Sequence, residues 1–279
     1  MSIASTLRLA LLLAIAAPAA PAFAQTCTST IPAADLVTPG KVQLSINPTL
    51  PPLQSVDSTG KLQGYNVDLG GEIAKRICLQ VELLRMDFPA MIPGLGAARF
   101  DGINTGMFWT EERSKIMFTV PYAQAAIGVI VNTDSKYKPT KPEELQGYTV
   151  AVDADSYQER WLRNFDKESV AKGMKPMTIR AFITPTEVMA TLRAGQADAA
   201  ALPTYTTTEI VRRGQAATAI PSMGATMITM AFRKKSVAEA VAKALTEMAA
   251  DGTYDKLFGH IGMALPEKTF AIRGPGPSS

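Results

Sequence analysis

The spacing of apolar and polar residues predicts alternating strands and helices along most of the chain. Residues 42–46 alternate between apolar and polar side chains, which predicts a half-buried strand, and apolar residues recur every four positions within 69–77, which predicts an amphipathic helix. A strand at 81–86, a short helix at 91–98 and a strand at 100–107 complete a β-α-β-α-β series. This order predicts a parallel sheet with helical crossovers.

A second series of strands and helices follows. Strands are expected at 127–132, 148–152, 177–183, 198–202 and 227–232, and helices around 161–165, 184–194, 204–213, 236–248 and 254–261. One helix has a clear start, because Thr184 is a suitable N-cap, Pro185 suits the first helical position and Glu187 completes a capping box. Ser236 and Glu239 have the same spacing, so a capping box is predicted there too.

The first segment, residues 1–24, has the composition of a secretory signal peptide. The basic residue Arg8 precedes an apolar run at 9–17, and small residues at 22 and 24 suit cleavage before Gln25. The apolar run is shorter than the roughly 20 residues that span a bilayer. The sequence therefore predicts export to the periplasm with removal of this segment.

The charge of the remaining chain is nearly balanced. Without Arg8 there are 27 basic residues against 25 acidic ones, and the basic residues form no long run. This balance argues against nucleic acid as a partner. Charged residues make up 19% of the chain and apolar residues 47%, as in ordinary globular proteins.

The chain has two cysteines, Cys27 and Cys78. In an oxidising compartment an even pair is expected to form a disulfide, which would tie the N-terminal arm to an early helix. The alternative is that Cys27 is a lipid anchor, although Gln25 and Thr26 stand where a lipoprotein signal prefers small residues.

The sequence carries few groups that could support catalysis. The single histidine, His260, lies in the last predicted helix and is expected to be solvated, so no base for a nucleophilic triad is apparent. The chain has no glycine-rich nucleotide loop and no Cys or His set with metal spacing. We therefore predict no cofactor, no metal and no catalytic residues, although an enzyme that uses carboxylates stays open.

Residues 100–122 (FDGINTGMFWTEERSKIMFTVPY) resemble the bacterial extracellular solute-binding proteins of family 3, in which a strand precedes a TxER helix and an FSxPY segment. Four further segments resemble the same family in the same order: 48–69, 89–95, 142–152 and 250–257. The resemblance therefore extends over nearly all of the chain after the signal peptide.

This resemblance implies an α/β protein with the two-lobe periplasmic-binding-protein-like fold (type II), in which each lobe is a mixed sheet flanked by helices and a two-strand hinge joins them. Lobe 1 would comprise residues 25–124 and 228–279, with a disordered C-terminal tail, and lobe 2 residues 125–227. The implied function is that of a monomeric, non-enzymatic receptor of an ABC importer, which closes around an amino acid or related organic acid and delivers it to an inner-membrane permease.

Arg113 matches the arginine of the TxER pattern, which implies that it binds the ligand's carboxylate. A guanidinium suits this role because its planar fork forms two hydrogen bonds with a carboxylate. The alternative is a surface salt bridge with Glu111 or Glu112. Thr105 and the backbone of residues 106–108 are expected beside it as hydrogen-bonding groups.

In lobe 2, the resemblance implies a ligand-binding turn at residues 151–158, where Ser156 matches a hydroxyl position and Asp155 replaces a glycine. A helix start favours anions through its free N–H groups, so Asp155 would compete with an anionic ligand or bind a cationic part of it. Simple helix capping is the alternative.

The sequence departs from the family pattern at several positions. Phe108 stands where the family has a hydroxyl residue, and Pro203 stands where it has the aspartate that binds the ligand's α-amino group. Leu50, Leu53 and Asn47 also replace residues near the implied site. The loss at Pro203 leaves two ligand classes open, an amino acid with Asp155 as ammonium partner, or a carboxylate without an α-amino group.

The walls of the predicted site are apolar: Phe88, Phe108 and Trp109. Thr204 and Tyr205 are weaker polar candidates beside Pro203. Two other functions stay open: a dehydratase on the same fold, similar to cyclohexadienyl dehydratases, with Asp155 or Glu187 as general acid, and a free sensor for signalling.

Overall fold

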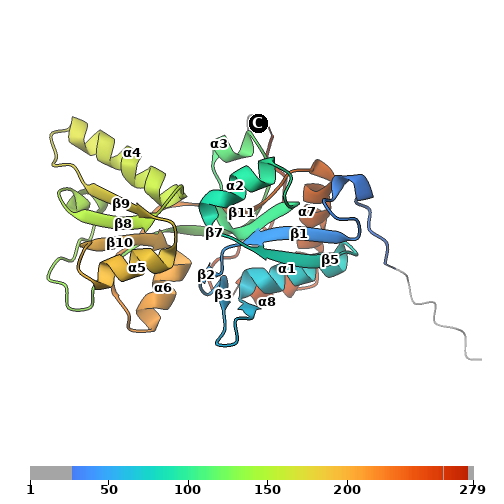
Figure 1. Ribbon diagram of the computed structural model, residues 1–279, viewed down its shortest axis with the longest axis horizontal. Coiled ribbons are helices and arrows are strands. Elements are labelled where there is room, and N and C mark those ends of the chain that lie inside the picture. The colour runs from blue at the N-terminus through green and yellow to red at the C-terminus, as the bar shows by residue number, and fades with distance from the viewer. Residues whose placement is uncertain (1–26, 260, 276–279) are drawn as a thin grey trace, which may run out of the picture.

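The computed structural model describes residues 27–259 and 261–275, which form two α/β lobes joined by two long strands (Figure 1). The predicted signal peptide, His260 and the end of the tail at 276–279 lie outside the described residues. The strands are β1 (Lys41–Ile46), β2 (Thr49–Leu50), β3 (Gln54–Val56), β4 (Leu62–Gln63), β5 (Gln80–Arg85), β6 (Gly102–Phe108), β7 (Phe118–Val131), β8 (Thr149–Asp153), β9 (Thr178–Phe182), β10 (Ala199–Pro203) and β11 (Ala217–Phe232).

The α-helices are α1 (Tyr65–Arg76), α2 (Phe88–Gly96), α3 (Glu111–Ser114), α4 (Tyr157–Ala171), α5 (Pro185–Arg193), α6 (Thr204–Arg212), α7 (Lys235–Ala250) and α8 (Thr253–Phe258), and the 3-10 helices are η1 (Ala33–Asp35) and η2 (Pro142–Leu145). Lobe 1 contains β1, β5 and β6 with α1, α2, α3, α7 and α8. Lobe 2 contains β8, β9 and β10 with α4, α5 and α6 (Figure 1).

The sheet topology confirms the predicted fold class. In lobe 1, β1 pairs in parallel with both β5 and β6, as the β-α-β-α-β series predicts. In lobe 2, β8 pairs in parallel with β10 and β9. The antiparallel strands β7 and β11 continue through both lobes, so the two lobe sheets merge into one, with the order β5-β1-β6-β11-β7-β10-β8-β9.

The pairing of the two connecting strands is interrupted between the lobes. Ile220 is opposite Val129 and Met223 is opposite Ile127, so three residues of β11 advance against two of β7. The same mismatch recurs before Thr226. Such bulges leave one residue unpaired and bend the strand. The ribbon that joins the lobes is therefore irregular at its middle.

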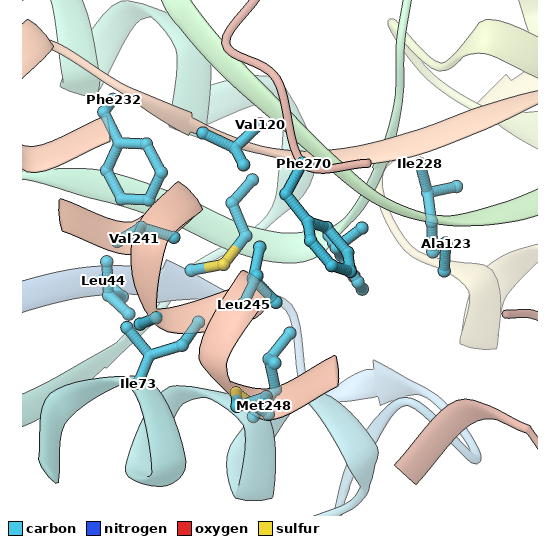
Figure 2. Packing of buried hydrophobic residues seen from close by; sticks show 14 of the residues in the cluster. Leu44, Ile73, Val120, Ala123, Ile228, Phe232, Val241, Leu245, Met248 and Phe270 are labelled. Atoms are coloured by element: carbon cyan, nitrogen blue, oxygen red, sulfur yellow. The ribbon is translucent and has the colours of Figure 1, made fainter. Parts of the chain in front are cut away.

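Each lobe has its own apolar cores. In lobe 1, Leu44 of β1, Ile73 of α1 and Leu245 of α7 belong to the cluster shown in Figure 2, which covers one face of the sheet. In lobe 2, Leu162 of α4 and Val188 of α5 belong to different clusters, on opposite sides of β8. The amphipathic stripes of these helices thus form the cores that hold each lobe together.

One predicted helix start is confirmed and one is wrong. Thr184 is the N-cap of α5, and its side chain and that of Glu187 form the expected capping box. Helix α7 instead begins after Lys234, so Ser236 lies inside the helix, where its hydroxyl donates to Asp35 at 2.6 Å. The tertiary contact with Asp35 replaces the local cap.

The predicted disulfide is confirmed. Cys27 and Cys78 are bonded, with Cα atoms 5.5 Å apart, which ties the N-terminal arm to the end of α1. At the other end of the chain, Arg273 forms an antiparallel bridge with Thr119 of β7. Both ends of the described chain are therefore attached to lobe 1.

Within residues 27–259 and 261–275, every helix is too short or too polar to span a bilayer. The same residues contain no cluster of three or more His, Cys, Asp or Glu side chains that could hold a metal ion.

Candidate ligand-binding cleft

A small cavity of about 30 Å³ lies between the lobes. Residues of both lobes line this cavity. Lobe 1 contributes Leu50 of β2, Phe88, residues 105–108 and Arg113. Lobe 2 contributes Asp153, residues 156–158, Pro203 and Tyr205. The strands β6, β8 and β10 reach it with their carboxyl ends. Ligands in open α/β sheets bind in such a crevice outside the carboxyl ends of the strands.

Arg113 lies in this cavity as a buried cation. Thr110 is the N-cap of α3 and accepts a hydrogen bond from the Arg113 backbone N–H, which fixes where the side chain starts. The guanidinium donates to Phe108 O at 2.8 Å and lies 5.1 Å from the centre of the Phe88 ring. Such a contact with an aromatic face is favourable for a cation.

The charge of Arg113 has no close counter-ion. The residue is only 4% exposed, and no carboxylate of the described residues lies within 4.0 Å of its guanidinium. Burial lowers the pKa of Arg113 to about 9, with a further effect from the positive charge of Arg160. The side chain is still a cation at neutral pH. A buried charge of this kind is normally paired, so the cavity is suited to an anionic group.

Asp153 lies in the same cavity and was missed in the sequence. It ends β8, is only 5% exposed, and its Oδ1 has no hydrogen-bond partner among the described residues. Burial raises the pKa of its carboxyl well above the usual range, and the negative charges of Asp87 and Glu187 raise it further. The signal that could have found it is its position at the carboxyl end of a buried parallel strand.

Two predicted hydroxyl residues, Thr105 and Ser156, line the cavity but already have internal partners. Thr105 Oγ1 accepts from the Asn47 N–H at 3.0 Å and from Gln54 Nε2 at 3.2 Å. Ser156 Oγ is the N-cap of α4, accepting from the Glu159 N–H at 3.0 Å, and it donates to Asp153 O at 2.7 Å. Ser156 therefore caps helix α4, as the helix-capping alternative predicted.

Aromatic side chains join the lobes across the cleft. The ring of Phe108 stacks on that of Tyr157, with centroids 5.0 Å apart and an angle of 7°. Tyr205 approaches β6 where Gly106 has φ +72°, and a Cβ on Gly106 would lie 2.9 Å from the Tyr205 hydroxyl oxygen. Glycine is needed here both for its backbone angle and for this close approach. Tyr157 was not predicted as a site residue.

Three other predicted residues lie outside the cavity. Asn47 is fully buried beside it, where its Oδ1 accepts from Thr49 Oγ1. Thr204 Oγ1 accepts from the N–H of Ala126, in the middle of β7, at 3.2 Å. Trp109 borders a separate hollow, and its ring lies under the guanidinium of Arg273, 5.2 Å away.

The predicted residue Asp155 is exposed and lines a second hollow between the lobes, which shares Arg113 with the small cavity. Its backbone has φ 56°, and its carbonyl accepts from Arg113 Nη2 at 3.2 Å. Asp155 thus contacts the arginine through its main chain.

A larger cavity of about 1,100 Å³ borders the hinge strands and α6. Neither Arg113 nor Asp153 lines it. Its acid Glu209 is paired with Arg212, at 2.7 Å, so these two charges already satisfy each other. We place the candidate site in the small cleft, because unpaired buried charges indicate ligand chemistry more directly than empty space does.

The cleft is closed in this structure. The Arg113 to Asp155 hydrogen bond and the Phe108 to Tyr157 stack both join lobe 1 to lobe 2. The remaining volume is about that of a single water molecule. Entry of a solute therefore requires the lobes to separate, and the irregular ribbon between them is the place where the chain can bend.

Comparison with known proteins identifies the family. Residues 42–261 match the family model for bacterial extracellular solute-binding proteins, family 3. The chain belongs to this family. The assignment made from the sequence is thus confirmed.

The histidine-binding periplasmic protein of Escherichia coli (strain K12) is 30% identical over 241 residues, covering 82% of this chain and 90% of that protein. Among solved structures, an ancestral arginine-binding protein bound to arginine is similar with a TM-score of 0.72 and 29% identity, over 79% of this chain and 97% of the other. An ancestral amino acid-binding protein, a precursor of cyclohexadienyl dehydratase, is similar with a TM-score of 0.69 and 26% identity, over 83% and 96% of the two chains.

Proposed function

We propose that this protein is the periplasmic receptor of an ABC importer, which binds an amino acid or a related small organic acid between its lobes. Arg113 holds the ligand's carboxylate. The observation that carries the proposal is the guanidinium of Arg113, 4% exposed and without a carboxylate within 4.0 Å among the described residues. A ligand carboxylate supplies the missing charge with two parallel hydrogen bonds.

The relatives support this proposal. They are named as binding proteins for histidine and arginine, and one is named as periplasmic. Each matched protein is covered over nine-tenths of its length or more, so the similarity extends to both lobes. The receptor is proposed to act as a monomer that presents its closed form to a permease, after removal of residues 1–24.

Ligand binding is proposed to shift an equilibrium between open and closed forms. Lobe 1 would comprise residues 25–124 and 228–279, and lobe 2 residues 125–227, with bending at the bulges of the connecting strands. A ligand favours the closed form only through contacts that exist there and not in the open form. Arg113 supplies such contacts, because its partner Asp155 O belongs to the opposite lobe.

A thermal-shift screen over the twenty amino acids, dicarboxylates and aromatic acids tests the proposal. The best ligand is expected to raise the melting temperature of the wild-type protein, because it binds only the folded state. Arg113→Ala should abolish this rise and Arg113→Lys should reduce it strongly, since an ammonium lacks the planar fork. Arg193→Ala, which removes an exposed arginine at the end of α5, is the matched control. Wild-type affinity in Arg113→Ala would refute the site assignment.

A dehydratase is the second candidate, because a precursor of cyclohexadienyl dehydratase is among the similar structures. The raised pKa of the buried Asp153 also keeps more of that carboxyl protonated, as a general acid requires. Incubation with arogenate or prephenate, followed by detection of phenylalanine or phenylpyruvate, distinguishes the two functions. Product formation would support the enzyme.

A further inference from the structure

The last described segment of the chain, residues 263–275, runs along β7, and we call it the C-terminal strap. It lies beyond the part of the chain that matches the family model. Main-chain hydrogen bonds join it to β7 at two places. The N–H of Gln124 donates to Met263 O at 2.9 Å, and Thr119 and Arg273 each donate an N–H to the carbonyl of the other, at 2.9 and 2.8 Å. The strap is therefore attached to the lobe 1 half of β7.

One role of the strap is to cover a sheet edge. In lobe 2, β10 pairs with β7 over 127–130, whereas no named strand of residues 27–259 and 261–275 pairs with the lobe 1 half of β7 on that side. An open strand edge invites pairing with other chains, and a covering segment prevents this. Phe270 anchors the cover, since it is 6% exposed and belongs to the lobe 1 core shown in Figure 2. Edge cover explains the main-chain bonds, but not the positions of Arg273 and Gly274.

Arg273 places its guanidinium over the ring of Trp109, 5.2 Å from the ring centre. Phe108 and Trp109 share a peptide group whose two ends have different partners. Its carbonyl, Phe108 O, accepts from the guanidinium of Arg113 at 2.8 Å, and its N–H, that of Trp109, donates to Met227 O at 2.8 Å. A cation over the Trp109 ring is a favourable contact, which helps to hold the peptide group that orients Arg113.

Gly274 contacts the chain on the other side of Arg113. Its φ is +76°, and a Cβ there would collide with Ser114 O and lie 3.0 Å from Met117 O. Glycine is needed at this position both for its backbone angle and for the close approach. Helix α3 has only four residues, and so short a helix is not stable by itself. The strap thus contacts the α3 turn both before and after Arg113.

We propose that the C-terminal strap is a positioning element for the binding arginine, in which Arg273 and Gly274 hold the turn of residues 108–115 so that Arg113 keeps its direction into the cleft. This inference rests on the proposed role of Arg113 as the carboxylate-binding residue. A group that is held in place before a solute arrives loses less conformational freedom on binding. Removal of the strap's contacts should therefore weaken binding, although neither Arg273 nor Gly274 lines the small cavity.

Hydrogen exchange in the ligand-free mature protein tests whether the strap holds the turn. The four N–H groups of residues 113–116 all donate within the α3 turn, so their exchange rates report its opening. In Arg273→Gln these rates should rise roughly two- to fivefold, as expected for the loss of one cation–aromatic contact. In Gly274→Ala they should rise at least roughly tenfold, because the new Cβ separates the strap from the turn. The amides of β1 and α5 should exchange as in the wild type.

Calorimetric titration with L-arginine and L-histidine, and with any compound that the thermal screen selects, tests the consequence for binding. Arg273→Gln should raise Kd roughly two- to fivefold, whereas Arg273→Lys keeps a cation over the ring and should bind within about twofold of wild type. Lys268→Gln is the matched control, because Lys268 is a cation of the same strap that pairs with Asp255, at 2.7 Å. Gly262→Ala is the control for Gly274→Ala, since Gly262 has φ +69° and open space around it.

The inference is wrong if residues 113–116 exchange at the wild-type rate in both Arg273→Gln and Gly274→Ala. It is also wrong if exchange rises equally in β1, because the strap would then serve only the general stability of lobe 1. Unchanged affinity in variants whose turn exchanges faster would likewise overturn it. If the wild-type protein binds no compound of the screen, the receptor proposal fails, while hydrogen exchange still decides whether the strap holds the turn.

Discussion

Buried polar groups differ in their hydrogen-bond partners between the interior of lobe 1 and the cleft beside it. In the interior, Tyr122 Oη donates to Asn66 Oδ1 at 2.8 Å, and Asn66 Nδ2 donates to Gln54 Oε1 at 2.7 Å. Gln54 Nε2 then donates to Thr105 O at 2.9 Å, which supports the strand that forms the cleft wall. In the cleft, the Arg113 guanidinium donates to the carbonyls of Phe108 and Asp155 but meets no carboxylate, and Asp153 Oδ1 has no hydrogen-bond partner among the described residues.

On the proposed function, this difference separates polar groups that specify the fold from those that would contact a ligand. A chain of satisfied hydrogen bonds makes the wall rigid, and a rigid wall holds unsatisfied charges in position. Stability should therefore depend most on the interior network, whereas affinity should depend most on the two charges. Substitutions in the two regions can test this separation.

The largest loss of stability is expected for Asn66→Ala. The side chain is fully buried and joins Tyr122 to Gln54, so its removal leaves a donor and an acceptor unsatisfied. The free energy of unfolding should fall by about 3 kcal/mol, measured by urea denaturation without ligand. Asn164→Ala, on the exposed face of α4, should have little effect. If Asn66→Ala lowered the free energy of unfolding no more than Asn164→Ala does, the hydrogen-bond network would not be what stabilises the cleft wall.

Asp153→Asn is expected to act in the opposite direction on the unliganded protein. It removes a buried carboxylate that has no partner at Oδ1 and that is repelled by Asp87 and Glu187. The free energy of unfolding at neutral pH should rise by about 1–2 kcal/mol. Denaturation of both proteins without ligand measures the gain. A destabilised variant would show that Asp153 serves the fold.

The gain from Asp153→Asn should depend on pH. Because the folded-state pKa of Asp153 is raised, the folded protein binds more protons than the unfolded chain between the ordinary aspartate pKa of about 3.9 and the raised value. Wild-type stability therefore falls across this window as pH rises, and the difference between variant and wild type grows from near zero to its plateau. Urea denaturation of both proteins from pH 4 to 8 tests this, since Asp87, Glu187, Tyr205 and Arg113 are the same in both. A difference that stays constant with pH would contradict it.

The smallest effect is expected at the border of the two regions, for Gly106→Ala. The backbone there has φ +72°, and the new Cβ would press on the ends of the Leu53 and Tyr205 side chains. A loss of about 1 kcal/mol in the free energy of unfolding is expected, together with weaker ligand binding, because Tyr205 could no longer approach lobe 1. Gly71→Ala, which has open space in α1, is the control. Equal effects of the two substitutions would argue against a tight approach at Gly106.

Much of the fold was predictable because it depends on local patterns. The strands around β1, the capping box at Thr184 and the cysteine pair were all predicted, and the structure confirms them. Arg113 was predicted from the TxER segment, and it does lie in the cleft between the lobes. The cap at Ser236 failed because a contact with Asp35, two hundred residues away in sequence, decided where that hydroxyl points.

The polar partner in lobe 2 could not be predicted in the same way. Asp155 stands beside Ser156 in the sequence, but its left-handed backbone presents a carbonyl to Arg113 and leaves its carboxylate exposed. Asp153 looks like the end of an apolar strand, and its burial arises only when β8 is placed next to β10 and α6. Burial of a single carboxylate is a tertiary property, which one sequence does not reveal.

The unpaired residues of β11 near Met223 and Thr226 would have an energetic consequence for the proposed opening and closing of the lobes. Backbone hydrogen bonds are already interrupted there, so such a motion could proceed by small changes in dihedral angles without breaking the ladder on either side. The proposed conformational step would then consume little of the free energy released by a bound solute. Most of that energy would remain to discriminate one solute from another and to set how long each one stays bound.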